Sequence, residues 1–197
     1  MDYLEQTRSR PVPTEPRALA HAVEELRDRA AIGALISLYS VARDDNDLDG
    51  VVSFFAPDGI FEVGGRQIRG HDELRSFYQG NMEKYRTSYH VNHTSVLSVR
   101  DQVAEGIVTG HAELAYRGTL MLAGIRYADD YRKLDDRWVF AHRRLRFMYA
   151  VPADQLAGSF VDRLRIRWPG EEPALADIPE GLPTYPGPAG ASREGGR

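Results

Sequence analysis

The sequence predicts an α+β fold in which helices pack on one face of an antiparallel sheet. Apolar residues recur at helical spacing within the first 82 residues, whereas residues 88–149 alternate as four successive strands. Short turns at residues 100–102 and 135–136 interrupt the strand region, so we expect successive strands to pair as a meander. A run of helices followed by a run of strands is typical of the α+β class.

Length and composition predict one domain with a tail at each end. The chain has 197 residues, of which 42% are hydrophobic, and this is enough for a single core. We expect a flexible N-terminal arm at residues 1–17, the domain at residues 18–152 and a C-terminal extension at residues 153–197.

Composition also argues against several classes of function. The formal net charge is −4 and the isoelectric point about 5.9, which argues against nucleic acid as a partner. The chain has no cysteine, which excludes disulfides, thiolate metal sites and a cysteine nucleophile. We see neither a signal peptide nor an apolar run long enough to span a membrane, so we expect a cytoplasmic protein.

The first helix is expected over residues 18–43 and should end at an acidic corner. One face of it is defined by residues at three- and four-residue spacing, namely Ile32, Leu35, Ile36, Tyr39 and Ala42. The corner contains Asp44 and Asp45, whose side chains compete for backbone hydrogen bonds and favour helix ends. A short helix over residues 51–55 should follow, capped by Asn46 or Asp47.

A turn, a small hairpin and a third helix are expected next. Pro57-Asp58-Gly59 indicates a turn before a strand at residues 60–63, and Gly64-Gly65 turns that strand back into residues 67–69. The third helix should start at Asp72 and bury one apolar side, made of Leu74, Phe77, Tyr78 and Met82.

The remaining chain divides into four long strands and a tail. The strands are expected at residues 88–99, 103–116, 119–134 and 138–149, with an interruption of the third near Gly124. Residues 169–197 contain six prolines and six glycines, a composition typical of disorder or of a segment that wraps a neighbour.

Several short motifs, taken in order, resemble the SnoaL-like branch of the nuclear-transport-factor-2-like superfamily over residues 20–150. They are Leu38-Tyr39 with an acidic residue shortly after, Phe55-Ala56-Pro57-Asp58-Gly59, Arg69-Gly70-His71-Asp72-Glu73-Leu74, Tyr89-His90, Arg126-Tyr127-Ala128-Asp129-Asp130-Tyr131 and Trp138-Val139-Phe140. The resemblance implies a cone-shaped α+β barrel, in which a strongly curved, mostly antiparallel sheet wraps around the N-terminal helices and encloses one apolar pocket. This fold hosts unrelated functions, so the reaction has to be argued from the site.

The resemblance also implies a catalytic pair. Within the family, scytalone dehydratase, bile-acid dehydratase and lindane dehydrochlorinase share an Asp near the end of the first helix and a His on the first long strand. Asp44 and His90 occupy these positions here, and Tyr39 matches the catalytic tyrosine of the bile-acid enzyme. Both dehydratases carry a further polar residue on the next strand, for which His111 is the nearest candidate.

These residue types suit proton abstraction without a cofactor. A neutral imidazole removes a proton near neutral pH, and a carboxylate on its far nitrogen fixes the tautomer and stabilises the imidazolium. A tyrosine hydroxyl polarises or protonates an oxygen of the substrate. Each residue also has a plain structural interpretation, with Asp44 as a solvated helix end and Tyr39 as a core residue. Residues five apart on a helix point about 140° apart, so these two side chains should not stack.

Three histidines raise the question of which side of the sheet each one faces. His90 and His93 lie three apart on one expected strand, so they should face opposite sides unless a bulge intervenes. The resemblance selects His90 for the cavity, with Asn92 on its face, and His93 is retained as a candidate substrate contact. His111 is either a cavity residue or an exposed polar one. A metal site formed by the three histidines is disfavoured by their opposite facing, so no metal is expected.

Two further candidate substrate contacts are Phe55 and Arg146. Arg143, Arg144 and Arg146 on the last strand form a stripe that is more simply a solvated strand face, and Arg146 is kept as a candidate. The sequence contains no G-x-S-x-G motif and no P-loop. The Asp-Arg-Asp relay of limonene-type epoxide hydrolases has no clear place in it either.

Two functions from different classes follow. The first is a cofactor-independent lyase, isomerase or cyclase that acts on a small apolar oxygenated molecule, such as a polyketide, terpenoid or steroid of secondary metabolism. The second is a non-catalytic ligand-binding or assembly subunit with the same fold. A hydrogen bond between Asp44 and His90 inside an enclosed pocket would favour the enzyme. Family members commonly form dimers or trimers, so we expect a homo-oligomer.

Overall fold

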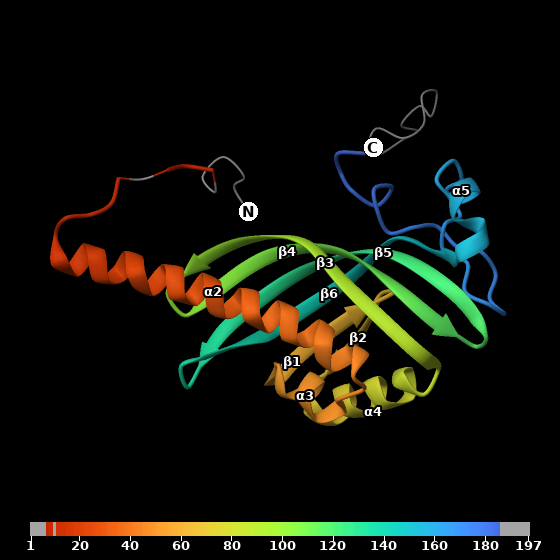
Figure 1. The fold of residues 1–197 in the computed structure, drawn as a ribbon, viewed down its shortest axis with the longest axis horizontal. Coiled ribbons are helices and arrows are strands. Elements are labelled where there is room, and N and C mark those ends of the chain that lie inside the picture. The colour runs from red at the N-terminus through yellow and green to blue at the C-terminus, as the bar shows by residue number, and fades with distance from the viewer. Residues whose placement is uncertain (1–6, 10, 186–197) are drawn as a thin grey trace, which may run out of the picture.

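The structure is a computed structural model, and it describes residues 7–9 and 11–185. It consists of N-terminal helices and one curved sheet, followed by a C-terminal segment that packs on the end of the sheet (Figure 1). The elements are α2 (Pro16–Asp44), α3 (Leu48–Ser53), β1 (Phe55–Val63), β2 (Arg66–Arg69), α4 (Gly70–Met82), β3 (Tyr85–Arg100), β4 (Val103–Tyr116), β5 (Thr119–Leu134), β6 (Arg137–Pro152), a 3-10 turn (Ala153–Gln155) and α5 (Leu156–Ser159).

The six strands form a single sheet in the order β2-β1-β6-β5-β4-β3. All neighbouring strands are antiparallel except β1 and β6, which run parallel. The α+β class and the mostly antiparallel sheet are therefore confirmed. The sheet is open rather than closed into a barrel, because β2 and β3 are its two edges.

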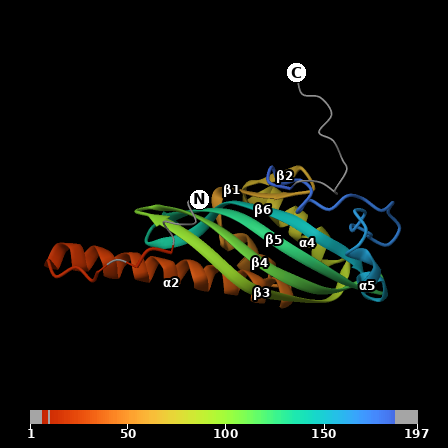
Figure 2. The same cartoon turned by 90° about the horizontal axis from the view of Figure 1, so that it is seen from above.

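Helix α2 lies along the concave side of the sheet, against β3 and β6, while α4 packs on β1. The first turns of α2 extend beyond the end of the sheet, as both views show (Figures 1 and 2). The helix begins where the Glu15 carboxylate accepts a hydrogen bond from the Ala18 backbone N–H at 2.8 Å. The face predicted from periodicity is buried, from Ile32 at 0% to Ala42 at 7% exposure. No helix of the described chain is long and apolar enough to span a bilayer.

Tight turns and bulges give the long strands their pairing and curvature. Two-residue turns with positive φ at both positions connect β4 to β5 at Arg117-Gly118 and β5 to β6 at Asp135-Asp136, which suits the twist of antiparallel hairpins. The register of β5 against β6 shifts at Gly124, where a side chain would lie 2.4 Å from the Tyr149 ring. Such irregularities bend a strand and increase its twist.

The predicted turn at residues 57–59 needs correction. Residues 57–59 do not form a separate turn before the strand, because they lie inside β1 at the point where its register against β6 shifts. The bulge absorbs the backbone change that Pro57 and Gly59 require without ending the strand.

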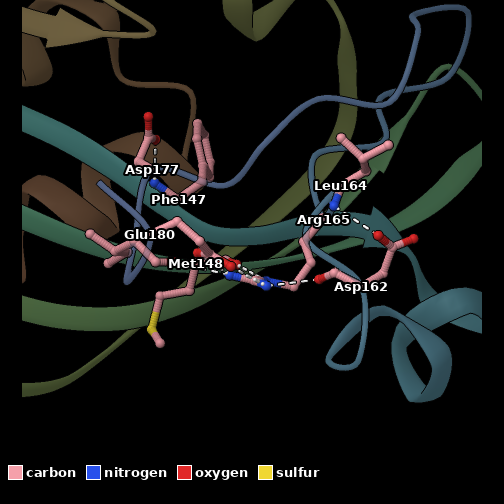
Figure 3. A network of polar contacts seen from close by, with 8 residues as sticks. Phe147, Met148, Asp162, Leu164, Arg165, Asp177 and Glu180 are labelled. Atoms are coloured by element: carbon pink, nitrogen blue, oxygen red, sulfur yellow. Dashed lines mark hydrogen bonds and ion pairs between the residues drawn. The ribbon is translucent and has the colours of Figure 1, made fainter. Parts of the chain in front are cut away.

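The C-terminal segment is ordered over much of the region predicted to be disordered. Ala176 and Ile178 are buried, and the Arg165 guanidinium holds the segment together, as Figure 3 shows. It makes two bonds to the Glu180 carboxylate, at 2.8 and 2.6 Å, and donates to the Met148 carbonyl at 2.9 Å. The expectation of disorder from about residue 169 is therefore wrong up to residue 185, and residues 186–197 lie outside the described part.

Candidate active site

A pocket of about 360 Å³ lies between α2, α4 and the concave face of the sheet. Most of its lining is aliphatic or aromatic, which is typical of small-molecule sites of this size. Five tyrosines contribute to the lining, and the other polar lining residues are Arg43, Asn81, Lys84, His90 and Glu171. Trp168 and Glu171 belong to the C-terminal segment, so this segment completes the wall.

Asp44 and His90 meet at the edge of this pocket. The Asp44 Oδ1 atom lies 2.6 Å from His90 Nδ1, and Asp44 Oδ2 accepts the His90 backbone N–H at 2.8 Å. Both side chains are largely buried, with 18% and 11% of their surfaces exposed. One carboxylate therefore fixes both the backbone and the ring of the histidine.

The charge of Asp44 is stabilised by the same contacts. Burial raises the pKa of Asp44, but hydrogen bonds from the His90 ring and backbone outweigh burial and bring the pKa below its ordinary value. An ionised carboxylate accepts the proton on Nδ1, and a neutral His90 then has its lone pair on Nε2. Since His90 lines the pocket, this nitrogen is the one left available to a ligand.

The end of α2 and the middle of β3 are held in register by a second contact. Asn92 Nδ2 donates to Ser40 Oγ at 2.9 Å, one helical turn before Asp44. The predicted substrate contact at Asn92 is thus a helix-to-strand tie, and Asn92 does not line the pocket. The tie sets the height of β3 on the helix and so brings His90 level with Asp44.

Tyr39 lies inside the pocket wall and pairs with a second tyrosine. Its hydroxyl is 2.9 Å from the hydroxyl of Tyr78 on α4, and both residues are buried. Burial and the neighbouring Tyr39 raise the pKa of Tyr78 well above its ordinary value, so this hydroxyl stays protonated. Tyr39 does not need to stack on Asp44, because Asp44 acts on the pocket through His90.

Tyr78 and Arg43 are polar residues of the lining that were not predicted as site residues. The sequence predicts Tyr78 on the apolar side of the third helix, and it predicts Arg43 only as the last residue of the first helix. Arg43 lies four residues after Tyr39, so the two share a helix face, and this spacing is the sequence signal that identifies it. Arg43 is only 6% exposed and lines the pocket beside His90.

Four predicted substrate contacts lie elsewhere. His93 is exposed on the face opposite His90, as strand alternation predicts, and it lies where the register of β3 against β4 shifts. His93 Nε2 is 2.9 Å from His111 Nδ1, and neither histidine is among the pocket residues. Arg146 is exposed on the opposite face from Leu145 and Phe147, which line the pocket.

Phe55, the fourth, is 1% exposed and packs on the Tyr39 and Phe140 rings in the core. These four residues are therefore not carried into the proposed site. Within the described residues, no group of three or more histidine and acidic side chains is arranged to hold a metal ion.

A sequence profile described as the SnoaL-like domain matches residues 24–144. No curated protein matches the chain in sequence. Among solved structures, a protein of unknown function from Mycobacterium tuberculosis is 26% identical, with a TM-score of 0.61 over 69% of this chain and 79% of its own.

Two other solved structures share the fold at lower identity. A candidate scytalone dehydratase from Novosphingobium aromaticivorans is 21% identical, with a TM-score of 0.61 over 65% of this chain and 89% of its own. A hexachlorocyclohexane dehydrochlorinase, LinA-type3 from Novosphingobium barchaimii, is 20% identical, with a TM-score of 0.62 over 66% of this chain and 93% of its own.

Proposed function

The chain belongs to the SnoaL-like domain family, and we propose that it is a cofactor-independent enzyme of the lyase or isomerase type. The observation that carries this proposal is the 2.6 Å contact between Asp44 and His90 at the edge of a pocket lined mostly by aliphatic and aromatic residues. A subunit that only assembles or binds has no need of a carboxylate that orients an imidazole toward a pocket.

The names of the structural relatives fit the same chemistry. Dehydration and dehydrochlorination both remove a proton from carbon and expel a leaving group from the neighbouring carbon. A pocket of about 360 Å³, lined by aliphatic and aromatic side chains with tyrosine hydroxyls and a few charged groups among them, suits a small, largely apolar substrate that carries oxygen atoms. Polyketide, terpenoid and steroid-like molecules are of this kind.

In the proposed reaction, His90 Nε2 takes the proton from a carbon next to a carbonyl group. The electron pair of that C–H bond forms a double bond, and the imidazole becomes imidazolium. Asp44 stabilises this positive charge through Nδ1, and positioned proton transfer of this kind contributes roughly 100- to 10,000-fold to a rate.

The Tyr39 and Tyr78 hydroxyls are placed to serve the oxygen of the substrate. When one hydroxyl donates to the other, the acceptor still has its own proton to donate. That proton can polarise the carbonyl, or it can pass to the departing oxygen, so that the broken C–O bond yields water. If the oxygen does not leave, return of the proton to another carbon gives isomerisation instead.

Exchange of the substrate proton with solvent deuterium tests proton removal without knowledge of the product. We would incubate β-hydroxy ketones and β-hydroxy acids with the protein in D₂O and follow loss of the proton next to the carbonyl by NMR. The wild-type protein should catalyse exchange, His90→Gln should abolish it, and Asp44→Asn should slow it by roughly 100- to 10,000-fold.

Asp45 provides a matched control, because it is an exposed acid next to Asp44. Asp45→Asn should exchange at the wild-type rate. Equal rates in wild type, Asp44→Asn and His90→Gln would contradict the proposal, as would the absence of exchange throughout a broad panel.

A further inference from the structure

Arg43 is a buried cation in the pocket wall whose charge is not neutralised. Its side chain is 6% exposed, yet no carboxylate of the described residues lies within 4.0 Å of it. Nη2 donates to the Asn81 side-chain oxygen at 2.8 Å, and the guanidinium carbon lies 5.2 Å from the centre of the Tyr78 ring. Nη1 is buried without a hydrogen-bond partner in the structure.

This arrangement costs free energy unless a ligand completes it. Burying a charge is unfavourable without an opposite charge or a full set of hydrogen bonds, and most buried polar atoms in proteins are satisfied. A ring face and a neutral amide supply part of that compensation. They leave Nη1, which is buried, without a hydrogen-bond partner in a residue that lines the pocket.

The neighbouring groups do not supply the missing negative charge. Both oxygens of Asp44 are bonded to His90. Burial raises the pKa of both Tyr78 and Tyr85, so these hydroxyls remain neutral beside Arg43. Glu171, the one carboxylate in the pocket lining, is exposed.

We propose that the natural ligand of this pocket carries a carboxylate, and that Arg43 binds it. The planar guanidinium matches a carboxylate in geometry, and a charge-assisted bond from it would supply the missing negative charge. Arg43 directly precedes Asp44, the residue that holds His90, so the carboxylate would be bound close to the base. The substrate class then narrows to small, largely apolar carboxylic acids, and this narrowing rests on the proposed function.

Binding of simple acids and their amides tests the inference. We would titrate benzoate, phenylacetate, cyclohexanecarboxylate and cinnamate into the full-length protein, each beside its neutral carboxamide, and measure dissociation constants by NMR. At least one acid should bind the wild-type protein at least tenfold more tightly than its amide. Arg43→Met should remove that preference and leave amide binding unchanged.

Arg86→Gln serves as a matched control. Arg86 is an exposed arginine on β3 that does not line the pocket, so the variant should retain the full acid preference. The melting temperature of Arg43→Met should equal or exceed that of wild type, because the variant removes an uncompensated buried charge. Should Arg43→Met fail to fold, Arg43→Lys keeps the charge and should still weaken acid binding several-fold, because it loses the planar fork.

The inference is overturned if no acid binds more tightly than its amide, or if Arg43→Met keeps the preference. This result is independent of catalysis. Acid binding through Arg43 without deuterium exchange would leave the inference standing and remove the proposed enzyme. Deuterium exchange without any preference for acids would support the proposed enzyme and overturn the inference about Arg43.

Discussion

Asp44 makes two different kinds of contact with His90, and each has its own consequence. The bond to the backbone N–H fixes the position of β3 at the end of α2, whereas the bond to Nδ1 orients the ring. The first contact contributes to stability and the second to chemistry. Substitutions at single residues can therefore separate the two contributions.

The stability that Asp44 provides should depend on pH. Because its folded-state pKa lies below the ordinary value of 3.8, the unfolded chain takes up the proton first. The contribution is therefore complete above about pH 3.8 and is lost as the pH falls through the folded-state pKa.

Asp44→Asn should lower the free energy of unfolding by about 1–3 kcal/mol at pH 7, the usual range for bonds to a charged group. Urea unfolding at pH 7 and at pH 3 measures the free energy of unfolding of both proteins. The difference between the Asp44→Asn variant and the wild-type protein should be smaller at pH 3. Asp45→Asn should differ little from wild type at either pH. A difference that stays constant with pH would contradict the assigned pKa.

The hydroxyl pair of Tyr39 and Tyr78 should show measurable coupling. Each single substitution to Phe leaves a buried hydroxyl without its partner, whereas the double substitution removes both. Thermal or urea unfolding of the three variants should give a coupling free energy of about 1 kcal/mol. Strict additivity would mean that the hydroxyls do not bond in solution.

At the residue scale, the sequence predicted the positions of Asp44 and His90 only through the family resemblance. Their spacing of 46 residues carries no signal of its own, since it depends on how β3 docks on α2. For Arg143 the prediction was wrong. The sequence predicts a solvated stripe, but the Arg143 side chain is fully buried and pairs with Asp129. Its guanidinium carbon lies 3.8 Å from the centre of the Tyr127 ring. Strand alternation separates two faces without saying which one is inside.

At the scale of elements, a polar contact connects the first half of α2 to the sheet. The Asp28 carboxylate accepts the Trp138 indole N–H at 2.8 Å and pairs with the Lys133 ammonium at 2.9 Å. The contact lies four helical turns before the Asp44 corner, far along the helix from the pocket. It therefore supports the fold without contributing to the site.

Asp28→Ala should destabilise the protein and leave its site intact. The buried indole N–H of Trp138 would lose its acceptor, at a cost of about 1–3 kcal/mol. Urea unfolding measures the loss, and ligand binding should be unchanged in the folded protein. Glu24→Ala, an exposed acid one turn earlier, should leave the unfolding free energy near that of wild type.

The existence of most elements was predictable, as was an irregularity near Gly124, whereas the register shift beside His93 was not. The boundaries of β4 and β5 match the predicted ranges, because alternation and turn residues mark them clearly. The shift beside His93 depends on how β3 pairs with β4, which single-strand patterns do not encode. His93 and His111 lie on the same face because His111 pairs with Val91, two residues before His93.

At the scale of the whole molecule, the C-terminal segment completes the pocket. The Trp168 ring packs on Tyr116 and Phe147, at centroid distances of 5.3 and 6.0 Å. Composition predicted disorder here because proline and glycine are frequent. Proline and glycine are also common in turns, and a few hydrogen bonds are enough to order such a segment. Arg165 donates to the carbonyls of both Asp162 and Ile178, and so connects two parts of the segment (Figure 3).

Arg165→Ala should release this segment while the sheet stays folded. Limited proteolysis followed by mass spectrometry should then show faster cleavage within residues 170–182 than in wild type. Arg163→Ala, an exposed arginine two residues away, should be cleaved at nearly the wild-type rate. Equal protection of the Arg165 variant would mean that other contacts hold the segment.

The tautomer of His90 is the measurement that tests the central claim most directly. Nitrogen-15 NMR of the histidine rings at pH 8 distinguishes a proton on Nδ1 from a proton on Nε2. The contact with Asp44 predicts a protonated Nδ1 and a free Nε2 in the wild-type protein, and a loss of this preference in Asp44→Asn. A proton on Nε2 in the wild-type protein would contradict the account, because the ring nitrogen that Asp44 does not bind could then not act as a base.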